Sequence, residues 1–175
     1  MANSKSLVAY FSRKGNNYVN GSIVNLPIGN TEVIAKKIQE ITQGDIFRIK
    51  TVKPYPEDYT ETTNVAQEEK RDDARPEIAE RVVDMDLYDV IYIGYPNWWG
   101  TMPMAVLTFL ESYDFSGKTI VPYCTHEGSG IGNSERYIKE HCPNAKVLEG
   151  LAIRGGGVAG ADKDLVNWLK KLDLI

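Results

Sequence analysis

The chain has 175 residues and a formal net charge of −4, from 20 basic and 24 acidic side chains. This acidic balance disfavours binding to nucleic acid, whose phosphates require a concentrated positive surface, and it provides no polybasic patch for a membrane. Hydrophobic residues make up 42% and charged residues 25%, which is typical of a folded globular protein, so we expect residues 1–175 to form a single domain.

The first residues are mostly polar, and a strand pattern begins directly after them, at residue 6. Because no apolar run has the length of a signal peptide or of a transmembrane helix, we expect a cytoplasmic protein. Cys124 and Cys142 lack the spacing of a metal site, which predicts no bound metal. Their spacing leaves a disulfide open, but a protein of this size does not need one, so we expect two reduced thiols.

Short apolar runs rich in β-branched and aromatic residues alternate with segments of helical periodicity. The runs predict strands at residues 6–11, 45–49, 90–94 and 119–123, and a weaker fifth strand at 146–153. The periodic segments predict helices at residues 31–41, 67–75, 104–110, 133–141 and 162–172. This alternation indicates an α/β fold with a parallel sheet covered on both faces, in which ligands bind at the carboxyl ends of the strands.

The first candidate binding segment lies between the first strand and the first helix, and it ends in Gly29, Asn30 and Thr31. A helix N-terminus offers unpaired N–H groups and a partial positive charge, which favours a phosphate group. Ser12, Asn30 and Thr31 add hydroxyl and amide donors, and Asn17 lies within the same segment. A second interpretation also fits, in which Asn30 or Thr31 only caps the helix.

The second candidate segment follows the third strand and contains Pro96, Asn97, Trp98, Trp99 and Gly100. Consecutive side chains in a turn cannot both enter the same core, so we expect at least one of the two indoles to face the cleft. An indole there can stack on a planar ligand, and the backbone amides of the turn can bind the polar edge of its ring. We expect the other indole to pack under the helix that follows.

The third candidate segment follows the fourth strand and contains Thr125, His126, Gly128, Ser129 and Gly130. Its glycines allow the backbone to lie close to a planar ligand, while the hydroxyl and imidazole groups can form hydrogen bonds with it. A histidine at the carboxyl end of a central strand is also a candidate catalytic residue. Together the three segments predict a phosphate site after the first strand and a planar, apolar slot after the third and fourth strands.

Four motifs carry a resemblance to a known family: Tyr-Phe-Ser at 10–12, Gly-Asn-Thr at 29–31, Pro-Asn-Trp-Trp-Gly-Thr at 96–101 and Thr-His-Glu-Gly-Ser-Gly at 125–130. With these motifs the chain resembles flavodoxin and the wider flavodoxin-like group over nearly its whole length. The resemblance implies a three-layer sandwich with a five-stranded parallel sheet in the order 2-1-3-4-5, and FMN as the cofactor. It also implies FMN contacts for the residues named in the three candidate segments.

The chain departs from the family pattern at residues 13–28, which interrupt the usually short phosphate loop between Ser12 and Gly29. Loops of this length in a compact domain are commonly either functional or mobile. We expect this segment to fold over the phosphate or ribityl end of FMN.

Several functions remain compatible with the sequence. The first is an electron carrier that docks redox partner proteins and has no substrate pocket. The second is an NAD(P)H-dependent reductase of quinones or related small molecules, with His126 or a nearby tyrosine beside the reacting ring. The third is a non-redox binding module that no longer holds a flavin. The residues do not indicate which redox partner is used, nor the oligomeric state.

Overall fold

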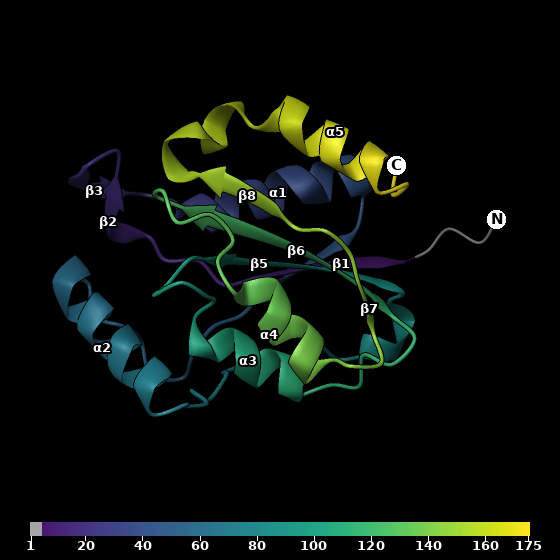
Figure 1. The fold of residues 1–175 in the computed structure, drawn as a ribbon, viewed down its shortest axis with the longest axis horizontal. Coiled ribbons are helices and arrows are strands. Elements are labelled where there is room, and N and C mark those ends of the chain that lie inside the picture. The colour runs from purple at the N-terminus through teal and green to yellow at the C-terminus, as the bar shows by residue number, and fades with distance from the viewer. Residues whose placement is uncertain (1–4) are drawn as a thin grey trace.

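A mostly parallel β-sheet forms the middle layer of the protein, with helices packed on both of its faces (Figure 1). The structure, a computed structural model, describes residues 5–175. The strands are β1 (Ser6–Tyr10), β2 (Gly15–Val19), β3 (Ser22–Leu26), β4 (Asp45–Arg48), β5 (Val90–Pro96), β6 (Thr119–His126), β7 (Lys146–Val147) and β8 (Leu151–Arg154). The helices are α1 (Asn30–Thr42), α2 (Tyr59–Arg71), α3 (Met104–Glu111), α4 (Ser134–His141) and α5 (Asp162–Lys171), with 3₁₀ segments η1 (Met85–Leu87) and η2 (Gly155–Gly160). Within residues 5–175, no helix has the length and apolar character needed to cross a membrane.

The sheet has the strand order expected from the sequence. Its path runs β4-β1-β5-β6, and both β7 and β8 pair with the outer side of β6, all in parallel. In the register, Val8 of β1 lies between Ile46 of β4 and Tyr92 of β5. Counted along the chain, the parallel strands therefore follow the order 2-1-3-4-5, which confirms the predicted topology.

The predicted fifth strand is broken into two short pieces, β7 and β8. Val147 of β7 pairs with Ile120, and Leu151 of β8 pairs with Tyr123, so the interruption lies opposite Pro122 of β6. Proline has no backbone N–H to donate to a ladder. Between β7 and β8, the Gly150 N–H has no partner in the ladder and donates to the Glu135 carboxylate of α4, at 2.8 Å.

The sheet separates two hydrophobic cores. Alternate residues of β1 enter opposite cores, as the twofold periodicity of a strand requires: Leu7 packs on the side of α3 and α4, and Val8 on the side of α1 and α5. Leu107 of α3 joins the first core, whereas Ile34 of α1 and Leu165 of α5 join the second, and all three are fully buried. Burial on both faces explains the nearly continuous apolar strands of the sequence.

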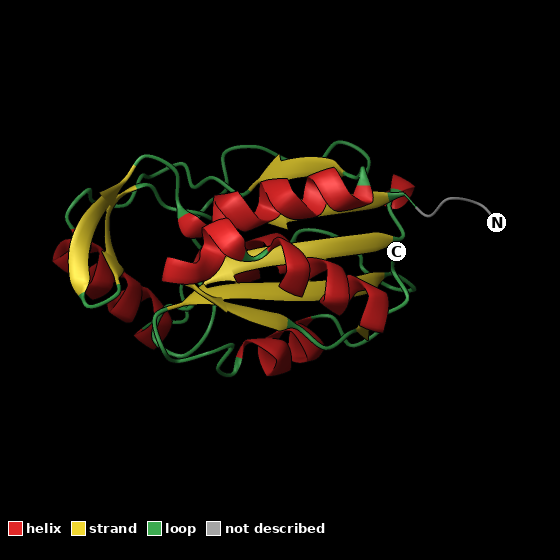
Figure 2. Ribbon diagram, turned by 90° about the horizontal axis from the view of Figure 1, so that it is seen from above, coloured by secondary structure: helices red, strands yellow, loops and turns green. Residues whose placement is uncertain are grey.

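Residues 13–28, expected to be a loop, contain an antiparallel hairpin formed by β2 and β3. Asn20 and Gly21 connect the two strands with φ angles of 52° and 88°, the left-handed conformation that a tight hairpin turn requires. The hairpin stands beside α2 at one end of the main sheet (Figure 2). The expectation of an irregular loop is therefore wrong for most of this segment.

Helix α2 begins and ends earlier than the predicted helix at 67–75. Its first turn is capped by Asp58, whose carboxylate accepts a hydrogen bond from the Glu61 N–H at 2.9 Å. The helix ends at Arg71, and Asp73 then adopts a φ of 49°, which turns the chain before Pro76. A proline disfavours helix at the residue before it, which predicts that the Arg75–Pro76 step ends the helix, but the chain leaves the helix before this step.

Two strands of the sheet extend further than predicted. Strand β5 includes Pro96, and β6 includes Thr125 and His126, whose partners in β5 and β8 continue the parallel register. The Asn97 N–H then donates to the Thr125 carbonyl oxygen at 2.8 Å. These three residues therefore belong to strand ends and not to loops, so the backbone positions them firmly.

Both cysteines are free, as the sequence predicts, and both are buried. Burial raises the pKa of the Cys124 thiol to about 12 and that of Cys142 to about 11. At neutral pH both residues therefore remain protonated thiols that pack as small apolar groups.

Candidate functional site

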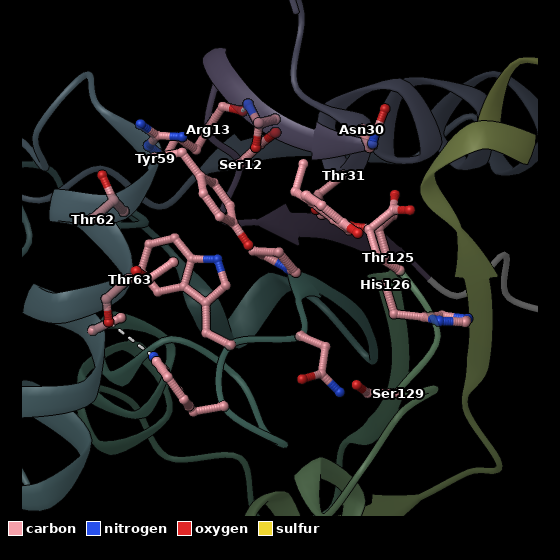
Figure 3. Close-up of a pocket in the computed structure, with 18 of the residues that line it drawn as sticks. Ser12, Arg13, Asn30, Thr31, Tyr59, Thr62, Thr63, Thr125, His126 and Ser129 are labelled. Carbon is pink, nitrogen blue, oxygen red and sulfur yellow. Dashed lines mark hydrogen bonds between the residues drawn. The ribbon is translucent and has the colours of Figure 1, made fainter. Parts of the chain in front are cut away.

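A cavity of about 520 Å³ opens at the carboxyl ends of β1, β5 and β6 (Figure 3). Its size is typical of small-molecule sites in proteins. The predicted site residues that line it are Ser12, Asn17, Asn30, Thr31, Pro96, Asn97, Trp98, Trp99, Gly100, Thr125, His126 and Ser129. Gly128 and Gly130 do not line the cavity, although Glu127 and Ser129 beside them do. The structure thus brings most of the predicted site residues together around one cavity.

At one end of the cavity, the N-terminus of α1 lies against Ser12. The Ser12 Oγ accepts a hydrogen bond from the Glu32 N–H at 3.1 Å. The N-cap position is Gly29, so the interpretation that Asn30 or Thr31 caps the helix is wrong. A Cβ at Gly29 would overlap the Ser12 hydroxyl oxygen, so only glycine allows this close approach. The polar side chains of the first helical turn therefore remain available to the cavity.

The hydroxyl groups of Thr31 and Thr125 join the first and third candidate segments. Their Oγ1 atoms lie 2.7 Å apart, and both side chains are buried. Since Thr31 lies in the first turn of α1 and Thr125 near the end of β6, this hydrogen bond fixes the distance between the helix N-terminus and the third candidate segment. Figure 3 shows both residues on the same side of the cavity as Asn30 and His126.

Arg13 lies beside Ser12 in the cavity wall. Its guanidinium donates to the carbonyl oxygens of Pro56 at 2.9 Å and Glu57 at 2.5 Å, and it also contacts that of Asn16. Burial lowers its pKa, partly offset by nearby Asp58. These bonds attach the base of the hairpin to the segment before α2 and hold the guanidinium charge there.

The second candidate segment forms a tight two-residue turn. The Trp98 N–H donates to the Thr101 carbonyl at 2.7 Å, and the Thr101 N–H returns a bond to Trp98 at 3.3 Å. Trp99 and Gly100 have φ angles of 56° and 84°, so both central residues are left-handed, as in a type I′ turn. This geometry directs the two indoles apart.

Both tryptophans line the cavity, but they differ in their surroundings. Trp98 packs edge-on against Phe11 and Tyr55, with ring centroids 5.2 and 5.1 Å away and interplanar angles of 80° and 82°. Trp99 is 46% exposed and lies at the rim. The site thus has a fixed inner indole and a more accessible outer one.

Helix α2 forms the wall of the cavity opposite the tryptophan turn. The sequence did not predict this role for the helix. The Trp99 Nε1–H donates to the Thr63 carbonyl at 2.9 Å, and the Lys70 ammonium donates to the Trp99 carbonyl at 2.5 Å. Thr62 and Ala66, both buried, complete this wall. The helix and the turn are therefore joined at the rim of the cavity.

Asn97 links the tryptophan turn to the glycine-rich third segment. Its Oδ1 accepts from the Gly100 N–H at 3.0 Å, and its Nδ2 donates to the Gly130 carbonyl at 2.8 Å. The Asn133 N–H also donates to the Gly100 carbonyl at 2.8 Å. Gly130 thus supports the site from behind the wall instead of facing the cavity.

His126 has a defined tautomer. The Gly128 N–H donates to its Nδ1 at 2.9 Å, so Nδ1 is unprotonated and the proton of the neutral ring is on Nε2. Burial and the nearby Arg154 lower the pKa of His126, while Glu127 acts in the opposite direction. His126 is therefore neutral at pH 7 and presents an N–H donor.

Seven residues that line the cavity were not among the predicted site residues: Arg13, Tyr18, Tyr59, Thr62, Thr63, Ala66 and Glu127. Most come from the hairpin and α2, whose positions depend on tertiary contacts. Glu127 could have been predicted from the sequence, because it lies inside the third candidate segment, between His126 and Gly128. The hairpin carried another signal in the Asn20-Gly21 pair, which is a common hairpin turn.

The sequence matches the family profile for Flavodoxin over residues 5–172. Among solved structures, a Bacteroides eggerthii protein described as a flavoprotein is 30% identical, with a TM-score of 0.76 and 98% of this chain and 99% of that chain covered. A Lactobacillus acidophilus flavoprotein in complex with FMN is 22% identical, with a TM-score of 0.65 and coverages of 94% and 98%. An NADH:FMN oxidoreductase is 13% identical, with a TM-score of 0.56 and coverages of 96% and 86%. A search of curated protein sequences returned no significant match.

Proposed function

This chain belongs to the flavodoxin family, and from this premise we propose that it carries electrons on a bound FMN to a redox partner protein. FMN is the cofactor that the family implies, and a structural relative has been solved in complex with it. When bound, FMN supplies the redox chemistry, while the protein sets its orientation, its surroundings and its accessibility.

The residues of the cavity fit the parts of FMN. The N–H groups at the start of α1, together with the Ser12 and Thr31 side chains, suit a phosphate. The tryptophan turn and α2 suit a planar aromatic ring. The observation that carries the proposal is that both features open into one cavity of about 520 Å³.

The exposure of Trp99 supports an electron-carrier role. This indole lies at the rim, 46% exposed, and its hydrogen bond to Thr63 keeps it beside α2. An aromatic group at the mouth of the cavity offers an apolar contact for a docking protein close to the ring site. The electron carrier is therefore the function that we place first.

The test is a reductive titration of the purified protein loaded with FMN under nitrogen. We expect tight binding of FMN, at least tenfold tighter than that of riboflavin, because only FMN uses the helix N-terminus. We expect reduction by dithionite, slow reaction with NADPH, and rapid reoxidation by a one-electron protein acceptor such as cytochrome c. Failure of the protein to bind added FMN would contradict the proposal and favour a binding module without flavin.

A second candidate function is NAD(P)H-dependent reduction of a quinone, which His126 favours. This reaction takes a hydride from NAD(P)H and delivers two electrons and two protons to the quinone, so a donor near the acceptor oxygen assists it. His126 lines the cavity with its proton on Nε2. Rapid bleaching of bound FMN by NADPH, with turnover of added benzoquinone that decreases in His126→Phe, would select this function over the carrier.

A further inference from the structure

Strand β3 of the hairpin has an open edge. Its one strand partner among residues 5–175 is β2, with which it forms a separate two-stranded sheet. Four of its five residues are exposed, including Ile23 at 50% and Val24 at 36%. The hairpin stands at one end of the molecule (Figures 1 and 2), so the outer edge of β3 is accessible to another strand.

The hairpin turn decides which backbone groups of β3 point outward. In a two-residue hairpin the residues that flank the turn, here Val19 and Ser22, form a pair that exchanges both hydrogen bonds. Bonded and non-bonded pairs then alternate along the strands. The N–H and C=O groups of Ile23 and Asn25 therefore point away from β2. Outward backbone groups of this kind are the template on which a further strand adds.

The edges of the two sheets differ in charge. Each strand at an edge of the main sheet carries a charged residue: Asp45 and Arg48 in β4, Lys146 in β7 and Arg154 in β8. Charges on an edge strand discourage its pairing with other chains. Residues 15–31, which contain the whole hairpin, have no charged side chain, although 25% of the residues of the chain are charged. The edge of β3 therefore lacks this protection, which indicates that another strand covers it.

The absence of charge also identifies the strand that fits. In a twofold dimer, residues near the axis face their own equivalents, so a charged residue there meets a like charge. The hairpin contains no such residue. A strand of acidic or basic character, by contrast, would find no opposite charge on β3. A second copy of β3 is neutral and offers an equal row of outward backbone groups, so it is the occupant that these features favour.

We propose that two copies of this chain associate through β3, in antiparallel pairing centred on Val24. In this register Ile23 of each copy exchanges both backbone hydrogen bonds with Asn25 of the other copy, and the two Val24 side chains meet across the axis. The product is a four-stranded sheet that links two cavities, since Asn17 and Tyr18 of β2 line each of them. This association requires no bound cofactor.

The first measurement is the mass of the purified protein in solution. A contact of one five-residue strand from each copy is smaller than the interface of a permanent dimer, so the association is reversible. We expect the mass to rise from that of one chain, 19.6 kDa, toward twice this value as the protein concentration increases through the micromolar range. Sedimentation velocity, with and without added FMN, measures this change.

Opposite charges at Val24 test the register. Val24→Lys and Val24→Glu each place two like charges against each other at the axis, and each should weaken the dimer about tenfold or more. An equimolar mixture of the two variants should recover the dimer, because opposite charges then meet, and this recovery also shows that both variants fold. Val83→Lys makes the same change at a valine outside the hairpin that is 92% exposed, and this control should dimerise like wild type.

Amide exchange at single residues gives a second readout. The amides of Ile23 and Asn25 should become protected as the protein concentration rises. The amide of Val24, which faces β2 in the proposed pattern, should be protected at every concentration. Asn25→Pro removes one outward N–H from each copy and no bond to β2, so it should weaken the dimer about tenfold without a change at Val24.

Three results would overturn the proposal. The first is a wild-type protein that keeps the mass of one chain at its highest soluble concentration, which would leave a strand of another protein as the occupant of this edge. The second is a wild-type dimer that Val24→Lys and Asn25→Pro leave intact, because the copies would then meet elsewhere. The third is a mixture of the two charged variants that stays monomeric. None of these results bears on the proposed function, which the flavin titration decides.

Discussion

The indole N–H of Trp99 donates a 2.9 Å hydrogen bond to the carbonyl oxygen of Thr63, which joins the turn after β5 to helix α2 at the rim of the cavity. This helix lies at the end of the sheet and not on either of its faces (Figures 1 and 2), where Lys70 and the stacking of Tyr18 on Tyr59 also hold it. The Trp99–Thr63 bond is therefore one of the contacts that set the width of the cavity at the rim.

Replacement of Trp99 by phenylalanine tests this dependence, because it keeps an aromatic ring and removes the N–H donor. We expect the substitution to remove about 0.5–1 kcal/mol of stabilising free energy, which is the lower part of the range for one hydrogen bond because this bond is accessible to water. Amides of α2 should exchange faster, and FMN should dissociate about two- to fivefold faster. Stopped-flow release of FMN and hydrogen exchange measure the two effects.

Lys70→Met provides the comparison for Trp99→Phe. It removes the ammonium that donates to the Trp99 carbonyl, but this side chain lies at the surface, where water replaces the lost contact. Its effect on FMN release should be smaller than that of Trp99→Phe. Equal α2 exchange in Trp99→Phe and wild type would show that the indole bond does not hold the helix.

A second prediction concerns two buried tyrosines that differ in their hydroxyl partners. The Tyr95 hydroxyl donates to Ser134 Oγ at 2.8 Å, whereas the Tyr123 hydroxyl is buried without a partner in the described part of the chain. Tyr95→Phe should therefore lower the free energy of unfolding by about 1 kcal/mol. Tyr123→Phe should leave it unchanged or raise it, because an unsatisfied polar atom is removed.

Chemical denaturation of the protein without ligand measures both changes. The two substitutions remove the same atom from fully buried side chains, so each serves as the control for the other. A comparable loss of stability in both variants would mean that Tyr123 has a partner, such as a buried water molecule.

The fold was predictable where burial dictates the sequence. Strands β1, β5 and β6 are covered on both faces, so their residues form nearly continuous apolar runs that are visible without a structure. The break between β7 and β8 was not visible, because it depends on Pro122 in the neighbouring strand. Register between strands is a tertiary property that a single segment does not carry.

The site was predictable where its residues follow a strand. The carboxyl ends of parallel strands meet at one edge, which brought Ser12, Trp98 and Thr125 together from distant segments. Residues of α2 and of the hairpin could not be placed in this way. Both elements lie outside the three-layer core, and contacts such as those between Tyr18 and Tyr59 decide their positions.

A third prediction concerns Asn97, which bonds the Gly100 N–H through Oδ1 and the Gly130 carbonyl through Nδ2. Asn97→Ala removes both bonds and should lower the free energy of unfolding by about 2 kcal/mol. Asn97→Asp retains the acceptor for Gly100 but places a carboxylate oxygen opposite the Gly130 carbonyl. At neutral pH it should therefore be destabilised as well.

Acidification distinguishes these two variants. Below about pH 4 the introduced carboxyl group takes up a proton and can donate to the Gly130 carbonyl. The stability difference between wild type and Asn97→Asp should therefore shrink as the pH falls, while that for Asn97→Ala should stay constant. If the differences in unfolding free energy from wild type had the same pH dependence in both variants, the bond to the Gly130 carbonyl would not contribute to stability.

The fourth prediction is a pH dependence that arises from His126. Its pKa in the folded protein is lowered from the ordinary value of about 6.5, chiefly by burial and also by Arg154. The unfolded chain therefore binds a proton at a higher pH than the folded protein does. The contribution of His126 to the free energy of unfolding is therefore complete above about pH 6.5. It decreases as the pH falls from there through the lowered pKa of the folded protein.

Protonation of His126 should also leave a specific structural signature. The second proton goes to Nδ1, the atom that accepts the Gly128 N–H, so this hydrogen bond is lost when the ring becomes charged. The amide resonance of Gly128 should therefore titrate together with the imidazole resonances of His126. In His126→Asn the loss of stability as the pH falls below about 6.5 should be smaller than in wild type, whereas His141→Asn should retain it. A Gly128 amide that does not respond to pH while His126 titrates would rule out the assigned tautomer.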